Sequence, residues 1–519
     1  MKFMKIACVI AVALCLAGSV YAETQSVKVS GDLTVRGIAR DHYDYLDRAG
    51  SIEDGANNTR TNQAWMMSVA EIQVDADLTD NVQTVIRLVN QRDWNVSDRD
   101  TDDDSIYPNG LGQYSNNEDA FNVMVDLAYV TLKDFIYSPL TLTIGRQDLW
   151  FGKGFIVGAN MQNPGMSLNG SPNQLNGIGS NLGTTGNLSA PEYTAITGFD
   201  SVKAVLDYDP WTITGVYANI QTGAVQALDD INLWGVNVGY KFDAYKAEME
   251  GYWFWKNDNA VHVDASLKDR TNNVQTIGLR GSFDPIDVIT IAAEGAYQGG
   301  TYVGSEAQTS NDGRSAWALD VSVEGRMFTD KYSWKPKIGA EFIWYSGEAQ
   351  RNDSAGASGT YNGWDPMYRG KFDSAIREFV GRFYQSGRFG SSADQLVSCP
   401  DASFTNQYQV IFLGSIQPME SLTIKANYNL FWNQEQYQMY DTKTKGFVGQ
   451  EIDINTTWDY TEDVSFGLMA GIFVPGTVYD TSNQGNGMYE NGGGADYEDK
   501  WTTGNQIATD IVGSVKVSF

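Results

Sequence analysis

Lysines and arginines that alternate with apolar side chains are the residues best placed to do chemistry in this chain. Six of them fall on the polar side of period-two segments and are candidates for lining a passage and selecting its solutes: Arg36, Arg87, Lys203, Arg280, Arg326 and Lys425. Aspartates and glutamates such as Glu71, Asp126 and Glu341 share that side. Opposite charges on neighbouring strands can pair and stiffen a wall, or they can form the charged rings of a selective channel. Both interpretations stay open.

A second basic group lies between residues 364 and 389, in a chain that is otherwise acidic. Its candidate cations are Arg369, Lys371, Arg377 and Arg382. Large apolar residues recur there at helical spacing, which gives one apolar face that needs a cover: Phe372, Ile376, Phe379 and Phe383. We expect the segment either to fold into a barrel mouth as a constriction or lid that offers arginines to anionic solutes, or to pack as a helix on its own extracellular loop.

The histidines are too few and too isolated to support nucleophilic catalysis. Only His42 and His262 occur, both in expected loops, and no serine- or cysteine-centred motif lies beside them. A serine or cysteine nucleophile ordinarily needs a histidine base held next to it. The haem-attachment pattern Cys-x-x-Cys-His does not occur either. We therefore expect neither an enzyme nor a bound cofactor or metal.

The elements that carry the charges are segments of strict alternation. Along residues 27–36, apolar residues and glycine alternate with charged and hydroxyl side chains, and residues 70–78 and 422–430 repeat the pattern. Segments of about ten residues that alternate in this way are typical of membrane-spanning β-strands. The pattern predicts about 18 strands, an even number as in single-chain bacterial barrels. They lie near residues 25–38, 64–78, 81–91, 122–133, 138–147, 199–209, 211–221, 231–242, 245–256, 274–284, 287–298, 316–328, 335–346, 407–417, 421–432, 449–460, 463–474 and 508–519.

Two classes of connection separate these strands. Tight turns rich in Asp and Pro, such as Thr79-Asp80 and Asp209-Pro210, alternate with long gaps. The longest gaps are residues 39–63, 92–121, 148–198, 347–406 and 475–507. Short turns at one rim and long loops at the other distinguish an outer-membrane barrel from a soluble β-sandwich. We predict an all-β protein, an antiparallel up-and-down transmembrane barrel with short periplasmic turns and long extracellular loops.

The first 22 residues have the three parts of a secretory signal peptide. Lys2 and Lys5 precede an apolar run from Ile6 to Ala17, and a small-residue cleavage site ends at Ala22. The run is too short for a membrane-spanning helix, which needs roughly 20 apolar residues. The barrel is therefore expected to occupy residues 23–519. The formal net charge of −28 argues against nucleic acid as a partner.

Several stretches resemble a known family. The last strand ends the chain on Phe519 and resembles the C-terminal strand of outer-membrane proteins, in which a terminal Phe is the signal for the barrel-assembly machinery. Three further stretches resemble the alginate-export family of outer-membrane porins: Leu142-Thr143-Ile144-Gly145-Arg146-Gln147-Asp148, Trp364-Asp365-Pro366-Met367-Tyr368, and Gly449-Gln450-Glu451-Ile452-Asp453 with the later Gly471-Ile472-Phe473-Val474-Pro475-Gly476. The resemblance implies an 18-stranded barrel whose arginines and inward loops shape a conduit for an anionic polysaccharide.

Together these features predict a passive outer-membrane channel. Hydrophilic solutes would diffuse through it, with anionic oligosaccharides or small anions as candidates. The alternatives are a surface-adhesion or structural barrel, or a scaffold for a periplasmic partner. We expect both termini in the periplasm. The expected partners are outer-membrane lipid and lipopolysaccharide, the solutes, and the assembly machinery that would recognise Phe519.

Overall fold

The computed structural model describes residues 26–43, 62–94, 123–160, 190–221, 230–259, 271–302, 312–326, 331–348, 359–383, 403–436, 438–439, 442–443, 446–479 and 506–519. The predicted signal peptide, residues 1–22, lies outside these ranges, as do the central parts of the long loops. Within the described ranges the chain is almost entirely antiparallel strand. None of the described helices is long and apolar enough to cross a membrane.

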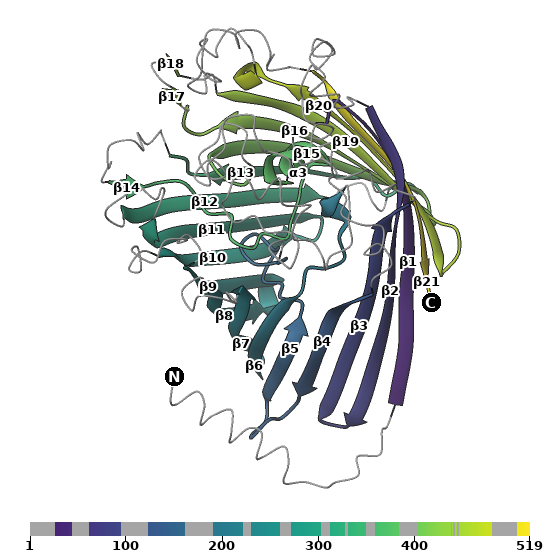
Figure 1. Cartoon of the computed structure of the whole chain (residues 1–519), viewed down its shortest axis with the longest axis vertical. Helices are drawn as coiled ribbons and strands as arrows, with labels where there is room; N and C mark the ends of the chain where they lie inside the picture. The colour runs from purple at the N-terminus through teal and green to yellow at the C-terminus, as the bar shows by residue number, and fades with distance from the viewer. Residues whose placement is uncertain are drawn as a thin grey trace, which may run out of the picture.

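In the described part of the chain, 18 long strands pair in sequence order and close into a barrel. The last strand pairs with the first, Ile38 opposite Val512 for example, so β1 and β21 lie side by side (Figure 1). The strands are β1 (Ser26–Asp41), β2 (Asn62–Thr79), β3 (Val82–Asp93), β4 (Met124–Leu132), β5 (Leu140–Gln147), β6 (Phe199–Tyr208), β7 (Trp211–Gln221), β8 (Ile231–Phe242), β9 (Ala247–Asp258), β10 (Asn272–Ile286), β11 (Ile289–Tyr302), β12 (Asp312–Gly325), β13 (Lys337–Tyr345), β15 (Gln407–Met419), β16 (Leu422–Asn433), β19 (Phe447–Asp459), β20 (Val464–Pro475) and β21 (Ala508–Ser518). The predicted fold class and strand number are confirmed.

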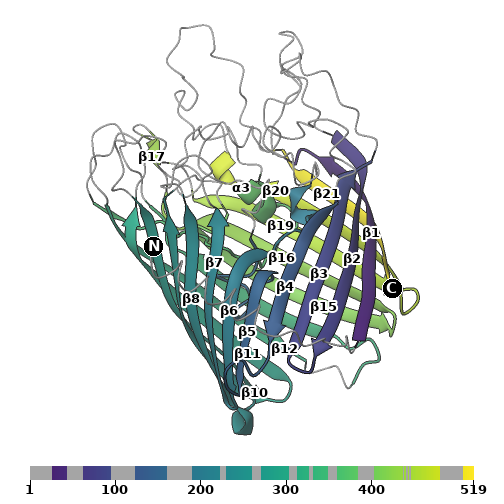
Figure 2. The ribbon, with the colours of Figure 1, turned by 60° about the horizontal axis from the view of Figure 1, so that its bottom comes forward.

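The remaining elements are short and lie in the long connections. They are the two-residue strands β14 (Thr360–Tyr361), β17 (Gln438–Met439) and β18 (Thr442–Lys443), the 3₁₀ turns η4 (Pro191–Tyr193) and η8 (Thr477–Tyr479), and the helix α3 (Arg377–Phe383). A further 3₁₀ turn, η5 (Asp243–Tyr245), joins β8 to β9. β14 pairs in parallel with β12, and α3 lies within the ring of strands (Figures 1 and 2).

Alternation places apolar side chains outside and polar ones inside. Ile277 and Leu279 of β10 expose 58% and 56% of their surface, while Arg280 faces inward onto the carboxylate of Glu250. Outward apolar side chains can meet lipid, whereas an outward arginine near the midplane would cost about 2–4 kcal/mol. This alternation, together with the pairing register, fixes which charges share the interior.

One side of the barrel interior holds a hydrophobic core. The core packs inner-face residues of β6 to β15 against two stretches of the long connections, and includes Phe155, Val157, Trp364, Tyr368 and Phe404, each at most 2% exposed. These stretches come from the connections after β5 and after β13. The barrel is therefore partly filled by its own loops.

Candidate functional site

Two loop segments meet inside the barrel and form the candidate site. We call residues 148–160, which follow β5, the first inward segment, and residues 359–383, which follow β13, the second inward segment. Their backbones bind each other: Tyr368 N–H donates to Ile156 O at 3.0 Å, Gly158 N–H to Tyr368 O at 2.8 Å, and Gly370 N–H to Gly154 O at 2.9 Å. These hydrogen bonds join the two inward segments, which follow different strands, into one structure.

The contact between the segments is close enough to require glycine. A Cβ on Gly370 would lie 2.6 Å from the carbonyl carbon of Gly158, and a Cβ on Gly158 would lie 3.0 Å from Gly370 Cα. Real Cβ atoms essentially never approach backbone as closely as 2.6 Å. Glycine at both positions therefore allows the backbones to meet.

Asp365 anchors the second inward segment to the wall. Its carboxylate accepts two hydrogen bonds from Lys256 Nζ of β9, at 2.9 and 2.7 Å, and one from Met367 N–H at 2.8 Å. Gln298 of β11 bonds both the N–H and the C=O of Asp365, each at 2.8 Å. Burial alone would raise the pKa of Asp365, but the ammonium of Lys256, the charge of Arg314 and the hydrogen bond from Met367 together outweigh burial and lower it to about 2.

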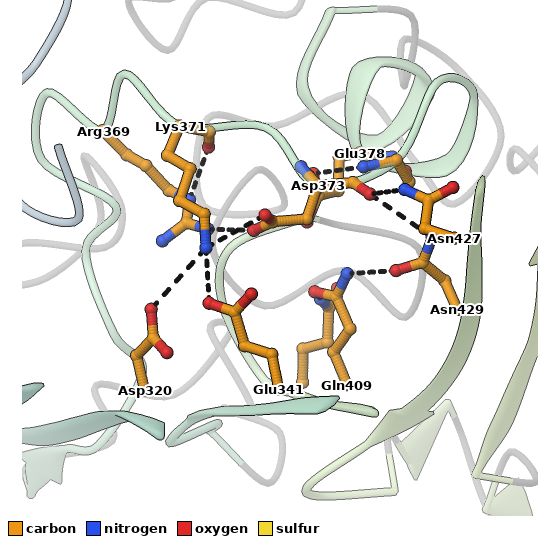
Figure 3. Close-up of polar contacts among 11 residues, drawn as sticks. Asp320, Glu341, Arg369, Lys371, Asp373, Glu378, Gln409, Asn427 and Asn429 are labelled. Atoms are coloured by element: carbon orange, nitrogen blue, oxygen red, sulfur yellow. Dashed lines mark hydrogen bonds and ion pairs between the residues drawn. The ribbon is translucent and has the colours of Figure 1, made fainter. Parts of the chain in front are cut away.

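Two cations of the second inward segment are held by acids (Figure 3). Arg369 donates to Asp373 at 2.9 Å, and the Arg369 side chain is 1% exposed. Lys371 pairs with Glu341 of β13 and lies 3.0 Å from Asp373, with its side chain 22% exposed. Burial alone would lower the pKa of Lys371, yet these carboxylates and Asp320 raise it above its usual value.

Carboxylates also bind the chain where α3 begins. Five consecutive backbone N–H groups, those of residues 373–377, donate to carboxylate oxygens. Glu378 accepts the first two, Asp453 accepts the third at 3.2 Å, and Glu451 accepts the last two at 2.7 and 2.8 Å. Ser374 Oγ accepts from Glu378 N–H at 3.0 Å, which completes a reciprocal cap. Burial, with a contribution from Asp373, raises the pKa of Glu378 to about 8.

Among its described side chains, the apolar face predicted from helical spacing is covered partly by the wall and partly by the loop itself. Ile376 is buried in a cluster with Phe431 and Phe473, and Phe372 stacks on Phe379 with ring centroids 4.3 Å apart. The helix itself is shorter than the pattern, because it begins only at Arg377. Of the four predicted cations of this segment, Arg369, Lys371 and Arg377 contact the barrel interior. Arg382 lies in α3, and its side chain falls outside the described atoms.

Three of the six predicted lumen cations are paired with acids. Arg87 donates to Asp126 at 2.6 Å and lies within 3.7 Å of Glu71 and 3.6 Å of Asp148. The other two pairings are Arg280 with Glu248 and Glu250, at 2.7 and 2.6 Å, and Arg326 with Asp284, at 3.4 Å. For these three residues, the structure favours ion pairs that stiffen the wall over the unpaired charges of a selective ring.

The other three predicted cations have no carboxylate within 4 Å among the described residues. The guanidinium of Arg36 lies 4.8 Å from the ring centre of Tyr193. Lys203 is electrostatically coupled to Asp148 without an ion pair, and Lys425 is exposed near the short-turn rim. These three residues therefore lack an ion pair, although Arg36 is electrostatically coupled to Glu71 as Lys203 is to Asp148.

Sequence reasoning missed several charges of the site. Lys256 and Asp320 lie on the inner parity of their strands, so the same alternation could have identified them. Arg40 is buried against Asp510 of β21 at 3.2 Å and against Glu192 of η4. No local pattern links residues 40, 192 and 510, because barrel closure brings them together. Among the described residues, no group of three or more His, Cys, Asp or Glu is placed to hold a metal.

Comparison with known proteins places the fold. No family model and no curated protein matches the chain. The structure is similar to OccAB1 of Acinetobacter baumannii, at 9% identity over 97% of this chain and 100% of that chain, with a TM-score of 0.51. It is also similar to OccK9 (OpdG) of Pseudomonas aeruginosa, at 10% identity over 95% and 99%, with a TM-score of 0.50. The chain has the outer-membrane porin fold.

Proposed function

We propose that this protein is a passive channel for small hydrophilic solutes. The observation that carries the proposal is that charged side chains on the inner face remain in contact with solvent beside the inward segments. The side chain of Asp148 is 51% exposed and that of Glu248 is 46% exposed, although both pair with arginines of the wall. A barrel filled completely by its loops would bury these carboxylates.

The inward segments act as a fixed constriction in this proposal. Lys256, Glu341 and Glu451 hold the second segment at three places on the wall, and the glycine contact ties the first segment to it. A constriction held by buried charge pairs limits solute size without a moving part. The interpretation as a packed constriction is thus favoured over a mobile lid.

Small anions are the proposed solutes. Arg36, Lys203 and Lys425 supply positive charge without a carboxylate within 4 Å in the described part of the chain, whereas Arg87 and Arg280 are neutralised locally. The resemblance to the alginate-export family extends the proposal to anionic oligosaccharides, and membership of that family is part of this proposal. We further propose that both termini face the periplasm, since the short turns lie at the rim that holds them.

Planar-bilayer recordings test the proposal. The refolded protein should conduct, and its reversal potential in a salt gradient should indicate anion preference. The double variant Arg36→Gln/Lys203→Gln should lose that preference, while Lys246→Gln, which removes an exposed cation in a tight turn, should not. Deletion of residues 359–383 should raise conductance. A protein that inserts but conducts nothing would refute the channel and favour a structural or scaffold role.

A further inference from the structure

Trp150 lies where the two inward segments meet, and much of its surface faces solvent. It follows Asp148, which is coupled to the inner-face cations Arg87 and Lys203, and it precedes Gly152, whose Cβ position is 2.9 Å from Arg280 of β10. These neighbours place Trp150 inside the barrel. Nevertheless 55% of its surface is exposed, while Leu149 beside it is 1% exposed.

The indole is held against a floor of three glycines. A Cβ on Gly154, Gly158 or Gly370 would lie 2.5, 3.0 or 2.8 Å from atoms of the Trp150 ring system. The indole N–H donates to Gly152 O at 3.1 Å, which fixes the ring's orientation. One side of the ring system is therefore packed on backbone, and glycine is the residue that lets it approach so closely.

A fixed, half-exposed indole in a water-filled passage calls for an explanation. Trp side chains gain stability by burying their large apolar surface, yet this indole is held against backbone on one side and leaves 55% of the residue's surface to solvent. Binding sites join such surfaces to a few polar groups. Here the exposed carboxylate of Asp148 lies two residues away, with Arg87 3.6 Å from it.

We propose that Trp150 is a stacking platform for one sugar ring of a permeating saccharide. A pyranose presents a face of C–H bonds that can lie on an indole, while its hydroxyls form hydrogen bonds with nearby charged groups. Asp148, two residues before Trp150 in the chain, and Arg87, 3.6 Å from Asp148, are the candidates. The sugar needs no net charge to bind in this way. The inference rests on the proposed channel function and narrows its solutes to saccharides.

Current block by defined sugars tests the platform. Maltotriose and a galacturonic acid trisaccharide should each reduce the ion current through single channels, with measurable residence times. Trp150→Ala should weaken block by roughly tenfold, the lower end of the scale for a nucleic-acid base stacked on an aromatic side chain. Trp150→Phe should weaken block less.

Matched variants separate this role from general damage. Gly359→Ala adds a Cβ that meets no atom within 4 Å, and Trp94→Ala removes a 41% exposed indole at the end of β3. Both should leave sugar block unchanged. Unchanged block in Trp150→Ala, or block by choline but by neither sugar, would overturn the platform while leaving the channel intact. If the wild-type protein conducts no ions, the channel itself fails, and saturation-transfer NMR with maltotriose in detergent then decides the platform independently.

Discussion

Lys256→Met should release the second inward segment from the wall. Lys256 Nζ lies 2.7 and 2.9 Å from the two carboxylate oxygens of Asp365, and both side chains are at most 10% exposed. The pKa of Asp365 falls from 3.8 to about 2 in the folded protein, which corresponds to about 2 kcal/mol. Removing one partner of a buried pair costs roughly 3–5 kcal/mol. We expect the free energy of unfolding of Lys256→Met to be lower than that of the wild type by roughly 3–5 kcal/mol.

Two measurements detect whether the second inward segment has left the wall. Trypsin should cleave after Arg369 or Lys371 in folded Lys256→Met protein, because the wild-type protein holds both side chains in ion pairs, Arg369 with Asp373 of the same segment and Lys371 with Glu341 of β13. Single-channel conductance should also rise. Lys246→Met, which removes the exposed pair with Asp287, is the matched control. The double variant Lys256→Met/Asp365→Asn should cost less than the sum of the single variants, because it leaves no unpaired buried charge. Unchanged protease resistance and conductance in Lys256→Met would refute the anchoring role.

Three further predictions follow from other parts of the barrel. The pKa of Glu378 is raised to about 8 from its usual 4.5. Its stabilisation of the second inward segment on the wall should therefore be complete below about pH 4.5 and lost as pH rises through 8. Conductance should increase over that pH range, and Glu378→Gln should flatten the increase. Arg40→Met leaves Asp510 and Glu192 buried without this cation, so stability in urea should fall by roughly 3–5 kcal/mol, and a fall no larger than that for Lys246→Met would contradict the role of Arg40. Phe519→Ala keeps the backbone bonds between residue 519 and Gly31, so the refolded barrel should be stable while insertion by the assembly machinery in cells falls; normal insertion would exclude Phe519 as the signal.

The strands could be predicted because their determinants are local. Alternation of apolar and polar side chains decides which face meets lipid, and Asp and Pro turns mark where each strand ends. The predicted segments 211–221 and 231–242 coincide with β7 and β8. Elsewhere the boundaries differ by a few residues, as for β12, which begins at Asp312 and not at residue 316. The inner-face residues Asp312 and Arg314 of this extension are buried against the second inward segment, where Asp312 accepts a hydrogen bond from Gly359 N–H and Arg314 donates one to Gly363 O at 3.1 Å. Contacts with a distant loop, and not local alternation, therefore decide where this strand begins.

The site was predictable only in part, because its geometry depends on contacts across the barrel. The stretch from Trp364 to Tyr368 could be recognised as a motif, but its role as an anchor could not. That role depends on contacts with Lys256 and Gln298, which lie on strands β9 and β11. The pairing of Gly158 with Gly370 has no sequence signal at all, since glycine is common in this chain and the partner lies in another loop.

The basic character of the second inward segment has a structural cause that bears on selectivity. In an acidic chain, the cations between residues 364 and 389 suggested an attraction for anionic solutes. In the structure Lys371 faces Glu341 and Asp320, and Arg369 faces Asp373. A cation that neutralises a buried carboxylate adds little field to the passage, because the pair's charges cancel at the distance of a solute. Anion preference must then come from cations without such partners, and Lys371→Gln should alter loop docking more than it alters the reversal potential.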